Sequence, residues 1–394
     1  MVSPDLTRNE AADALLAELP DLALPTDGRA VVAMSGGVDS SVVAWLLARA
    51  DRAAVGLFMR NGVEVDEAAA AKKACCSVGD ARDARMIAAR MGIPFQAVDL
   101  APEFGSIIDY FVEEYRRGRT PNPCAVCNRD LKFDALLRFS EELGAEYVAT
   151  GHYARLQRPD ASPDGRVHVR RGVDVRKDQS YQLFCVSEAN LARTVLPLGE
   201  LQKPDVRALA EAAGLRTAKK PDSQEICFVP SNDYRKLLAE RGIDWNRGQL
   251  VDTSGRVLGE HAGTENFTIG QRRGLGVATG VPLFVVDIVP ETGTVVLGVR
   301  EECSSSGLVT EPANWIGFDP PATGSFRAAV QVRYHHTPAP ATIERDAGTG
   351  ELLVRFDEPQ HAVAPGQGAA LYQDDRLIGG GWIARTVPVR GAEV

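Results

Sequence analysis

Residues 34–41, MSGGVDSS, carry the strongest chemical pattern in this chain. Glycines let a polyanion approach the backbone, and serines supply hydroxyl groups. An apolar run typical of a strand, RAVVA, comes before the pattern, and a helical run, SVVAWLLARA, follows it. The free N–H groups and partial positive charge of a helix start would therefore face a bound anion. The stretch predicts a phosphate-binding loop at the carboxyl end of a strand.

A second pattern places two cysteines three positions apart, Cys124 and Cys127, in TPNPCAVCNRDLKF at residues 120–133. A zinc site of the cysteine type would need another closely spaced pair. The other cysteines do not supply one, because Cys75 and Cys76 are adjacent and the rest are isolated: Cys185, Cys227 and Cys303. We therefore predict reactive thiols instead of structural zinc.

Cys127 precedes residues that can cap a helix, and Arg129 and Lys132 follow closely. A helix start and neighbouring cations both favour the thiolate, so we expect a lowered pKa for Cys127. Cys227 lies in KKPDSQEICFVP, again beside polar and basic residues. Two separated thiols suit sulfur transfer, in which one carries a persulfide and the other resolves it as a disulfide.

Composition limits the setting of this chemistry. The chain has 394 residues, a net charge of −9 and 44% hydrophobic residues, as expected for a folded protein of two or three domains that does not simply coat nucleic acid. No apolar run approaches the ~20 residues that cross a bilayer, and the start of the chain is acidic where a signal peptide would be basic. We expect a cytoplasmic protein that spans no membrane, with reduced cysteines.

The order of elements predicts the fold class. Up to about residue 240, apolar runs at 29–34, 53–59, 94–100 and 145–150 alternate with helical patterns, which indicates a parallel, Rossmann-like sheet covered on both faces. After Gly248, short alternating segments between turn signals indicate two small antiparallel β-barrel modules. The predicted domains are an N-terminal extension, a catalytic domain, a central β domain and a C-terminal β-barrel, at residues 1–28, 29–240, 241–305 and 306–394.

The loop is neither a GxxxxGK[ST] loop nor a GxGxxG fingerprint. It resembles the SGGxDS pyrophosphate loop (PP-loop) of ATP pyrophosphatases, which cleave ATP between the α and β phosphates to adenylate a substrate. Further motifs, in this order, resemble those of the bacterial tRNA-specific 2-thiouridylase family, from about residue 29 to residue 385: LFMRN, TPNPCAVCNRDLKF, ATGHYARL, RKDQSYQLF, PDSQEICF, FTIGQRRGLG, VQVRYHH and PGQGAALY.

The resemblance implies roles for individual residues. Cys127 matches the nucleophile, and Cys227 matches the cysteine that bears the persulfide. The positions that match ATP contacts are Ala33, Met34, Ser35, Gly36, Gly37, Val38, Asp39, Ser40, Met59 and Gly151. The positions that match contacts with tRNA are Asn122, Pro123, Cys124, His152, Lys177, Asp178, Gln179, Arg333, Tyr334 and Gln367.

The implied reaction is ATP-dependent thiolation of C2 of the wobble uridine in tRNA, which gives 2-thiouridine, AMP and pyrophosphate. It implies ATP, with Mg²⁺ near Asp39, as well as tRNA, a persulfide sulfur donor or relay protein, and a thiol reductant. No cluster of side chains in the sequence indicates a protein-held metal. Three alternatives stay open, namely a PP-loop thiolase of a different tRNA base, an amide-forming synthetase and a non-catalytic RNA-binding module.

One position departs from the family pattern. Many members have Asp where this chain has Cys124, so a role of that Asp as a general acid or base would be vacant or taken by the thiol. Cys124 also creates a CxxC pair that could join Cys227 around an iron–sulfur cluster, an alternative that we do not favour.

Overall fold

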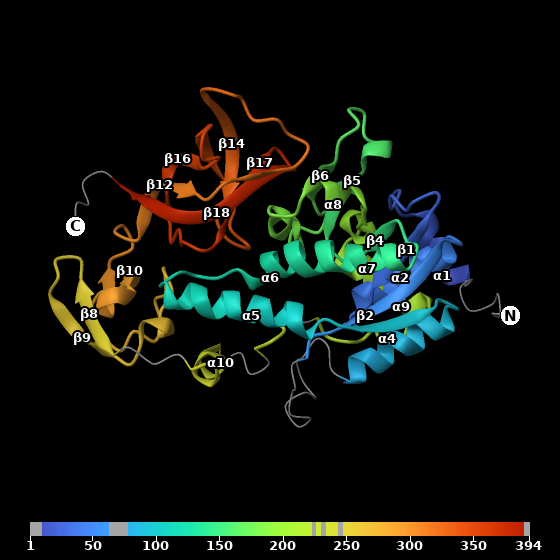
Figure 1. The fold of residues 1–394 in the computed structure, drawn as a ribbon, viewed down its shortest axis with the longest axis horizontal. Helices are drawn as coiled ribbons and strands as arrows, with labels where there is room; N and C mark the ends of the chain where they lie inside the picture. Colours follow the sequence, from blue (N-terminus) through green and yellow to red (C-terminus); the bar gives the residue numbers. More distant parts are fainter. Residues whose placement is uncertain (1–9, 63–77, 223–225, 230–233, 243–246, 390–394) are drawn as a thin grey trace. The chain divides into compact units, whose positions relative to one another are not determined.

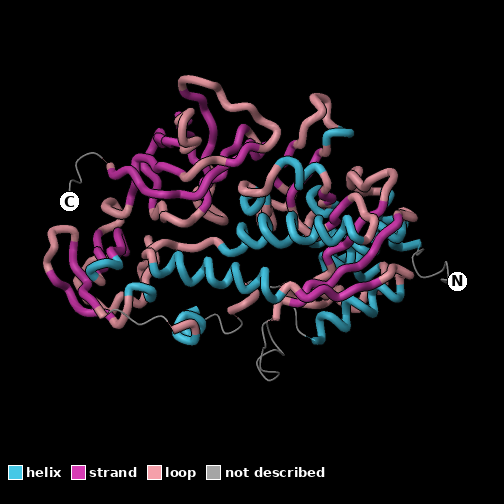
Figure 2. Tube along the Cα trace, in the orientation of Figure 1, coloured by secondary structure: helices cyan, strands magenta, loops and turns pink. Residues whose placement is uncertain are grey.

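The computed structural model describes residues 10–62, 78–222, 226–229, 234–242 and 247–389, and these form two compact units. The first unit comprises residues 1–106, 124–232 and 375–377, and the second comprises residues 107–123, 233–374 and 378–394. Cys75 and Cys76 lie outside the described residues. Figures 1 and 2 show the change along the chain from alternating helices and strands to a region made mainly of strands.

A five-stranded parallel sheet, in the order β3-β2-β1-β4-β7, forms the centre of the first unit. The bounds of its strands are β1 (Arg29–Ala33), β2 (Ala53–Arg60), β3 (Phe95–Asp99), β4 (Tyr147–Ala149) and β7 (Thr194–Val195). The chain runs outward from β1 through β2 to β3, and then returns to the other side of β1 to form β4. The strand order therefore reverses between β1 and β4, where open α/β sheets bind their ligands.

Successive residues of β1 point to opposite faces of the sheet, and both faces are covered. Ala30 and Val32 pack in one core cluster with α1, α2, α4 and α9, whereas Val31 faces the other side and is also fully buried. The N-terminal segment takes part in this core, since Ala12 is buried within the same cluster. The helices of the unit are α1 (Glu10–Ala17), α2 (Val38–Arg49), α4 (Val78–Arg90), α5 (Ala101–Arg116, which continues into the second unit), α6 (Pro123–Val126), α7 (Leu136–Glu142), α8 (Glu188–Ala192) and α9 (Lys203–Ala212).

The remaining elements of the first unit are short. They are the antiparallel pair β5 (Ala154–Gln157) and β6 (His168–Arg171), the π-helical segment η2 (Cys127–Ala135), and the 3-10 turns η3 (Pro159–Ala161), η4 (Ser180–Leu183) and η5 (Pro197–Glu200).

The second unit contains two β modules and the helix α10 (Tyr234–Glu240). The central module is a four-stranded sheet in the order β10-β11-β8-β9, made of β8 (Gly248–Asp252), β9 (Val257–His261), β10 (Phe284–Val289) and β11 (Thr294–Gly298), with the 3-10 turns η6 (Thr264–Asn266) and η7 (Pro290–Thr292). The C-terminal module follows the order β12-β16-β15-β14-β17-β18, and pairing of β12 with β18 closes it into a six-stranded barrel. Its strands are β12 (Ser304–Thr310), β13 (Asn314–Trp315, paired with β18), β14 (Ser325–Gln331), β15 (Ala339–Arg345), β16 (Leu352–His361), β17 (Gly368–Gln373) and β18 (Arg376–Pro388).

These elements confirm the predicted fold class, a Rossmann-like parallel sheet followed by small β modules. One detail differs from the prediction. β8 and β11 pair in parallel, so the central module is a mixed sheet, because the connection between its hairpins returns the chain in the same direction. Alternation of apolar residues predicts the strands but not which way neighbouring strands run.

The turn after β1 depends on a glycine. Gly36 has a φ of +71°, and a Cβ there would lie 2.4 Å from the backbone oxygen of Asp80. We expect Gly36→Ala to lower the free energy of unfolding of the first unit by about 2 kcal/mol or more, because the left-handed conformation and the clash both cost free energy. Urea unfolding followed by circular dichroism measures this loss.

Gly105, inside α5, is the matched control because a Cβ there meets no heavy atom within 4 Å. Gly105→Ala should raise the free energy of unfolding by roughly 0.5–1 kcal/mol, since alanine favours the helix and restricts the unfolded chain. Equal effects of the two substitutions would contradict the close contact at Gly36.

Candidate active site

The loop of residues 35–37 connects β1 to α2 and is closed by its own serines. The Ser35 amide donates to Ser40 Oγ at 3.1 Å, and Ser41 Oγ donates to the Gly37 carbonyl at 2.6 Å. Gly37 is the N-cap of α2, and no side chain caps the helix there. The first N–H groups of α2 therefore have no side-chain acceptor at the cap, which suits an anion at this position.

The end of β4 approaches this loop closely. A Cβ on Gly151 would lie 2.9 Å from Asp39 Cβ and 3.2 Å from the Ser40 amide nitrogen. Ala33 ends β1, and Met59 lies near the end of β2, the neighbouring strand. The structure thus gathers the ten predicted ATP positions at the carboxyl edge of three adjacent strands. Ser35 is exposed there, whereas Met34 and Val38 are buried, so a ligand would meet the backbone of those two residues.

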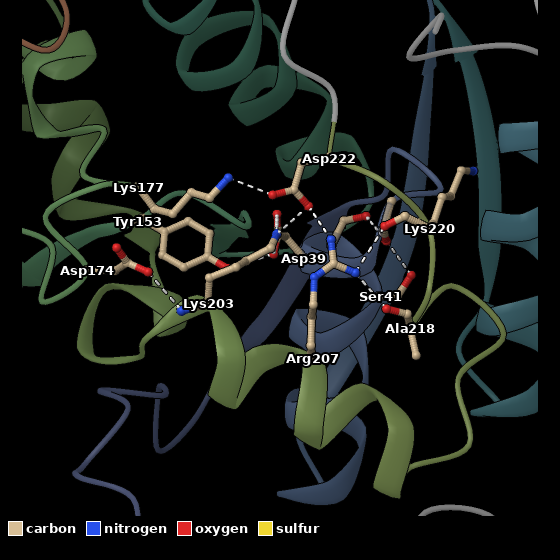
Figure 3. A network of polar contacts seen from close by, with 12 residues as sticks. Asp39, Ser41, Tyr153, Asp174, Lys177, Lys203, Arg207, Ala218, Lys220 and Asp222 are labelled. Carbon is tan, nitrogen blue, oxygen red and sulfur yellow. Dashed lines mark hydrogen bonds and ion pairs between the residues drawn. The ribbon is translucent and has the colours of Figure 1, made fainter. Parts of the chain in front are cut away.

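Asp39 is engaged by two side chains that the sequence did not single out (Figure 3). Lys203 Nζ lies 2.7 Å from Asp39 Oδ1 and 2.8 Å from Oδ2, and Tyr153 Oη donates to Oδ1 at 2.7 Å. Burial and the Asp39 charge both raise the pKa of Tyr153 well above its usual value, so its hydroxyl stays protonated and donates. Both oxygens of Asp39 accept hydrogen bonds in this arrangement.

Lys203 also reaches a second carboxylate, that of Asp222, at 3.0 Å (Figure 3). Asp222 accepts two further charged hydrogen bonds, from Lys177 Nζ at 2.6 Å and from Arg207 Nη2 at 2.7 Å. Burial acts to raise the pKa of Asp222, but the hydrogen bonds from Lys177 and Lys203 outweigh it and hold this pKa below its usual value. Asp222 is therefore an anion held by three cations.

A fourth cation, Lys220, holds the loop itself in place. Its Nζ donates to the Gly36 carbonyl at 2.8 Å, to Asp80 and to Asp83 at 3.2 Å. This cluster fixes the peptide on which the turn depends, and it joins the start of α4 to the loop.

Loop N–H groups and the Lys203 cation both lie at this edge of the sheet. Together these donors suit a bound polyphosphate. The Asp39 carboxylate, which pairs with Lys203 in this structure, would be the ligand for a Mg²⁺ ion bound with the phosphates. Among the described residues, no group of three or more His, Cys, Asp or Glu side chains is placed to hold a metal ion.

Cys127 does not begin a helix, which corrects our expectation. The helix α6 begins at Pro123, and Cys127 opens the π-helical segment η2 that continues it. Burial raises the pKa of the Cys127 thiol, although Lys132 acts in the opposite direction, so the prediction of a lowered pKa is wrong for this state. Arg129 contributes little to a thiolate because it pairs with its neighbour Asp130, at 2.5 Å and 2.8 Å.

The two other thiols of interest lie in different surroundings. Cys124 is exposed as a residue, yet its sulfur lies among protein atoms, and the resulting loss of solvation raises the pKa of its thiol. Cys227 is half-buried in a turn in which the Val229 amide donates to the Ile226 carbonyl. Phe228, next to it, is buried and packs edge-on against Phe104, which fixes the turn to α5.

A buried polar cluster lies directly after Cys127. His152 Nδ1 is 2.7 Å from Thr150 Oγ1, and His152 Nε2 is 3.2 Å from Asn128 Oδ1. Asn128 Oδ1 also accepts from Lys132 Nζ at 3.1 Å, and Asn128 Nδ2 donates to the Gln182 carbonyl. Since Asn128 Oδ1 only accepts, His152 carries its proton on Nε2.

Most predicted tRNA positions are held by contacts within their own unit. In the first unit, Lys177 pairs with Asp222, Asp178 accepts from the Gly172 and Ser180 amides, and Gln179 accepts from the Tyr153 amide. His152 is buried, so its imidazole lies away from the surface.

In the second unit, the predicted tRNA positions Gln367 and Arg333 donate to backbone carbonyls. Gln367 Nε2 donates to the carbonyls of Thr120 and Pro121, just before Asn122 and Pro123, and Arg333 donates to the His361 and Ala362 carbonyls. Tyr334 is half-buried next to Arg333.

Sequence reasoning missed Tyr153, Lys203, Arg207, Lys220 and Asp222. Tyr153, Lys220 and Asp222 lay inside or beside quoted motifs, so closer attention to the polar side chains in those motifs could have found them. Lys203 and Arg207 carried no such signal. A shallow pocket elsewhere, lined by Arg29, Ala53 and Phe95 at the starts of three strands, opens at the opposite edge of the sheet and is no part of this site.

The burial of His152 gives a pH dependence. Burial lowers the pKa of His152 well below its usual 6.5, and Lys132 acts in the same direction, so the folded protein keeps it neutral. The unfolded chain takes up a proton there below about pH 6.5, so this site loses stabilising effect as pH falls, by up to about 1.4 kcal/mol per pH unit. Urea unfolding at pH 7.5, 6.5 and 5.5 should show a shallower loss of stability for His152→Asn than for the wild type. Parallel curves for the two proteins would contradict the assignment.

Comparisons with known proteins agree with this organisation. The tRNA methyl transferase HUP domain family matches residues 28–231, its PRC-barrel domain family matches residues 235–299, and the aminomethyltransferase beta-barrel domain family matches residues 305–383. Among solved structures, the U34-tRNA thiolase NcsA from Methanococcus maripaludis is 21% identical with a TM-score of 0.35, and the match covers 59% of this chain and 72% of that one.

Among the described residues, no helix is both long and apolar enough to cross a bilayer.

Curated relatives are much more similar. The tRNA-specific 2-thiouridylase MnmA of Carboxydothermus hydrogenoformans is 48% identical over 360 residues, which cover 91% of this chain and 98% of the relative. The enzyme of the same name from Geobacter metallireducens is 48% identical over 367 residues, covering 90% and 96%. Identity at this level along nearly the whole of both chains means that the protein belongs to the tRNA-specific 2-thiouridylase family, MnmA.

Proposed function

We propose that this protein uses ATP to replace the C2 oxygen of the wobble uridine in tRNA with sulfur. The observation that carries the proposal is the PP-loop at the switch point of the sheet, in a chain that is 48% identical to a named 2-thiouridylase over 91% of its length. ATP is then a substrate, and the products are 2-thiouridine, AMP and pyrophosphate. The proposed domain boundaries are those predicted from the sequence.

Activation is the first step, because a carbonyl oxygen is a poor leaving group. The uridine O2 attacks the α-phosphorus of ATP, pyrophosphate leaves, and the oxygen becomes part of an adenylate. Loop N–H groups and Lys203 stabilise negative charge on the phosphates, and Mg²⁺, when bound near Asp39, supplies further charge neutralisation. The ion pair with Asp39 places the positive charge of Lys203 at the start of α2.

Sulfur transfer follows and uses both thiols. The terminal sulfur of a Cys227 persulfide attacks C2, and AMP leaves with the former uridine oxygen. The Cys127 thiolate then attacks Cys227 Sγ, which releases the sulfur on the uridine as 2-thiouridine and leaves a Cys127–Cys227 disulfide. A thiol reductant reopens the disulfide, and a persulfide donor reloads Cys227. No step passes through an iron–sulfur cluster.

The substrate contacts are proposals too. Asn122, Pro123 and Cys124 meet the target base, and the remaining contacts come from His152, Lys177, Asp178, Gln179, Arg333, Tyr334 and Gln367. Buried His152 would act through its backbone or after rearrangement. Because phosphate contacts release counterions, tRNA affinity should fall steeply with salt.

Mass spectrometry of tRNA nucleosides tests the proposal. Incubation of the protein with tRNA, Mg²⁺, ATP and a persulfide source should produce 2-thiouridine at the wobble position. Thiolation of another base would favour a different PP-loop thiolase, and ammonia-dependent AMP release without thiolation would favour an amide-forming synthetase.

Each of the two thiols should be essential. Cys127→Ser and Cys227→Ser should each abolish 2-thiouridine formation, because serine can neither carry nor resolve a persulfide, while ATP affinity stays unchanged. Cys303→Ser is the matched control, since Cys303 is buried in the second unit, where its thiol donates to the Val285 carbonyl. Cys124→Ser should lose part of the activity. Full activity in either essential variant would refute the assigned roles.

The raised pKa of Cys127 predicts the pH profile of the resolution step. Below that pKa the thiolate fraction rises about tenfold per pH unit, so resolution should accelerate from pH 7 to pH 9. Single-turnover release of 2-thiouridine from preloaded enzyme measures this rate. A rate that is already constant above pH 7 would mean that tRNA binding or another residue lowers the pKa of Cys127.

A further inference from the structure

Cys124 and Cys127 have a spacing at which two thiols of one chain can close a disulfide. Cys124 lies in α6, and Val126, the residue before Cys127, has the helical dihedral angles φ −61° and ψ −44°. Residues three positions apart on a helix have Cα atoms about 5 Å apart. Disulfides join residues whose Cα atoms are about 4.4–6.8 Å apart. A Cys124–Cys127 bond could therefore form within a single helical turn.

The two thiols also share one electrostatic environment. Burial raises the pKa of both, and the Lys132 ammonium acts in the opposite direction on each. Charge on Cys124 also raises the pKa of Cys127, so the two sulfurs interact. Lys132 is held beside the pair by Asn128, whose Oδ1 accepts from Lys132 Nζ at 3.1 Å. One cation thus favours the thiolate on either sulfur, and the thiolate is the form that attacks a disulfide.

Exposure distinguishes Cys124 from the two thiols of the proposed reaction. Cys124 is an exposed residue, whereas Cys127 and Cys227 are both half-buried. The turn that carries Cys227 is held in place, because Phe228 packs edge-on against Phe104. A disulfide between Cys127 and Cys227 would therefore join two half-buried residues, where a protein reductant has poor access.

A neighbouring thiol, that of Cys185, is not suited to exchange. Cys185 is buried, and its Sγ donates to the Ala125 carbonyl at 3.4 Å. Burial raises the pKa of Cys185 to about 12, so almost no thiolate forms there near neutral pH. Among the described cysteines of the first unit, this leaves Cys124 as the thiol that can compete with Cys227 for Cys127.

We propose that Cys124 is a second resolving thiol, which takes the disulfide from Cys227 and passes it to a dithiol reductant. The inference rests on the proposed function, which forms the Cys127–Cys227 disulfide. The Cys124 thiolate attacks Cys127 Sγ and forms the Cys124–Cys127 bond. The Cys127–Cys227 bond breaks, and Cys227 leaves as a thiolate that takes a proton from water. One disulfide replaces another, so no electrons enter or leave the protein in this step.

Reduction then takes place at Cys124. One thiolate of the reductant attacks Cys124 Sγ, and Cys127 leaves as a thiolate. The second thiol of the reductant displaces Cys124 and closes the reductant's own disulfide, so two electrons pass to the protein. Cys227 is already a reduced thiol at this stage. A persulfide donor can therefore reload Cys227 before the reductant has acted.

Peptide mass spectrometry after a single turnover tests this relay. Enzyme preloaded with persulfide reacts with tRNA, Mg²⁺ and ATP in the absence of reductant, and samples taken over time are quenched with N-ethylmaleimide. Trypsin cleaves on both sides of residues 120–129, so Cys124 and Cys127 share one peptide, whereas Cys227 lies in another. An internal disulfide leaves the shared peptide unalkylated and two hydrogens lighter than its reduced form.

The expected disulfide differs between the wild type and one variant. In the wild type, the Cys124–Cys127 disulfide should exceed the Cys127–Cys227 disulfide about tenfold at the end of the turnover, which corresponds to about 30 mV in reduction potential. Cys124→Ser should instead accumulate the Cys127–Cys227 disulfide, counted for each 2-thiouridine formed. Cys185→Ser is the matched control and should give the wild-type disulfide, because Cys185 contacts α6 but takes no part in the exchange.

A Cys127–Cys227 disulfide that persists in the wild type after 2-thiouridine has formed would overturn the proposal, as would a Cys124–Cys227 disulfide. Limiting diamide, which oxidises thiols without tRNA or ATP, tests the pair independently of thiolation. It should close Cys124–Cys127 in preference to Cys127–Cys227, and the reverse preference would also overturn the relay. Absence of 2-thiouridine together with the expected diamide result would instead refute the proposed function.

Discussion

The ion pair between Asp39 and Lys203 is the interaction on which the site depends. Asp39 lies in the first turn of α2 beside the loop, and Lys203 begins α9, so one contact fixes two helix starts against each other. Tyr153, just after β4, adds a hydrogen bond to the same carboxylate. Without a charge at position 39, Lys203 would remain a buried cation at a helix N-terminus with a single carboxylate partner. The pair thus holds the anion site in shape, and its lysine supplies positive charge there.

Close backbone approaches make that interaction possible. Gly36 lets the loop turn against Asp80, and Gly151 lets the chain after β4 pass beside Asp39. Both contacts lie at the carboxyl edge of the sheet, where the strand order reverses. The π-helical segment that begins at Cys127 brings Asn128 to His152, so the residue next to the thiol and the end of β4 share one buried polar cluster. Nucleotide chemistry and sulfur chemistry are therefore connected within the first unit.

Sequence reasoning recovered the parts of the molecule that local patterns encode. The phosphate loop was found because glycines, serines and a strand-to-helix transition lie within one short stretch, and the β modules were found because apolar residues alternate. Lys203 was not found, because its meaning arises only when α9 packs beside α2 and brings it to Asp39. The pKa of Cys127 was misjudged for a similar reason. Charged neighbours in sequence suggested a thiolate, whereas Arg129 is engaged by Asp130 and tertiary burial raises the pKa.

The central claim is that ATP activates the uridine by forming an adenylate on its C2 oxygen. A tRNA labelled with oxygen-18 at C2 of the wobble uridine tests it most directly, by mass spectrometry of the AMP formed during thiolation. We expect one labelled oxygen in AMP for each 2-thiouridine produced, because the uridine oxygen leaves on the α-phosphate. Unlabelled AMP together with labelled water would show that ATP is merely hydrolysed, and would contradict the account.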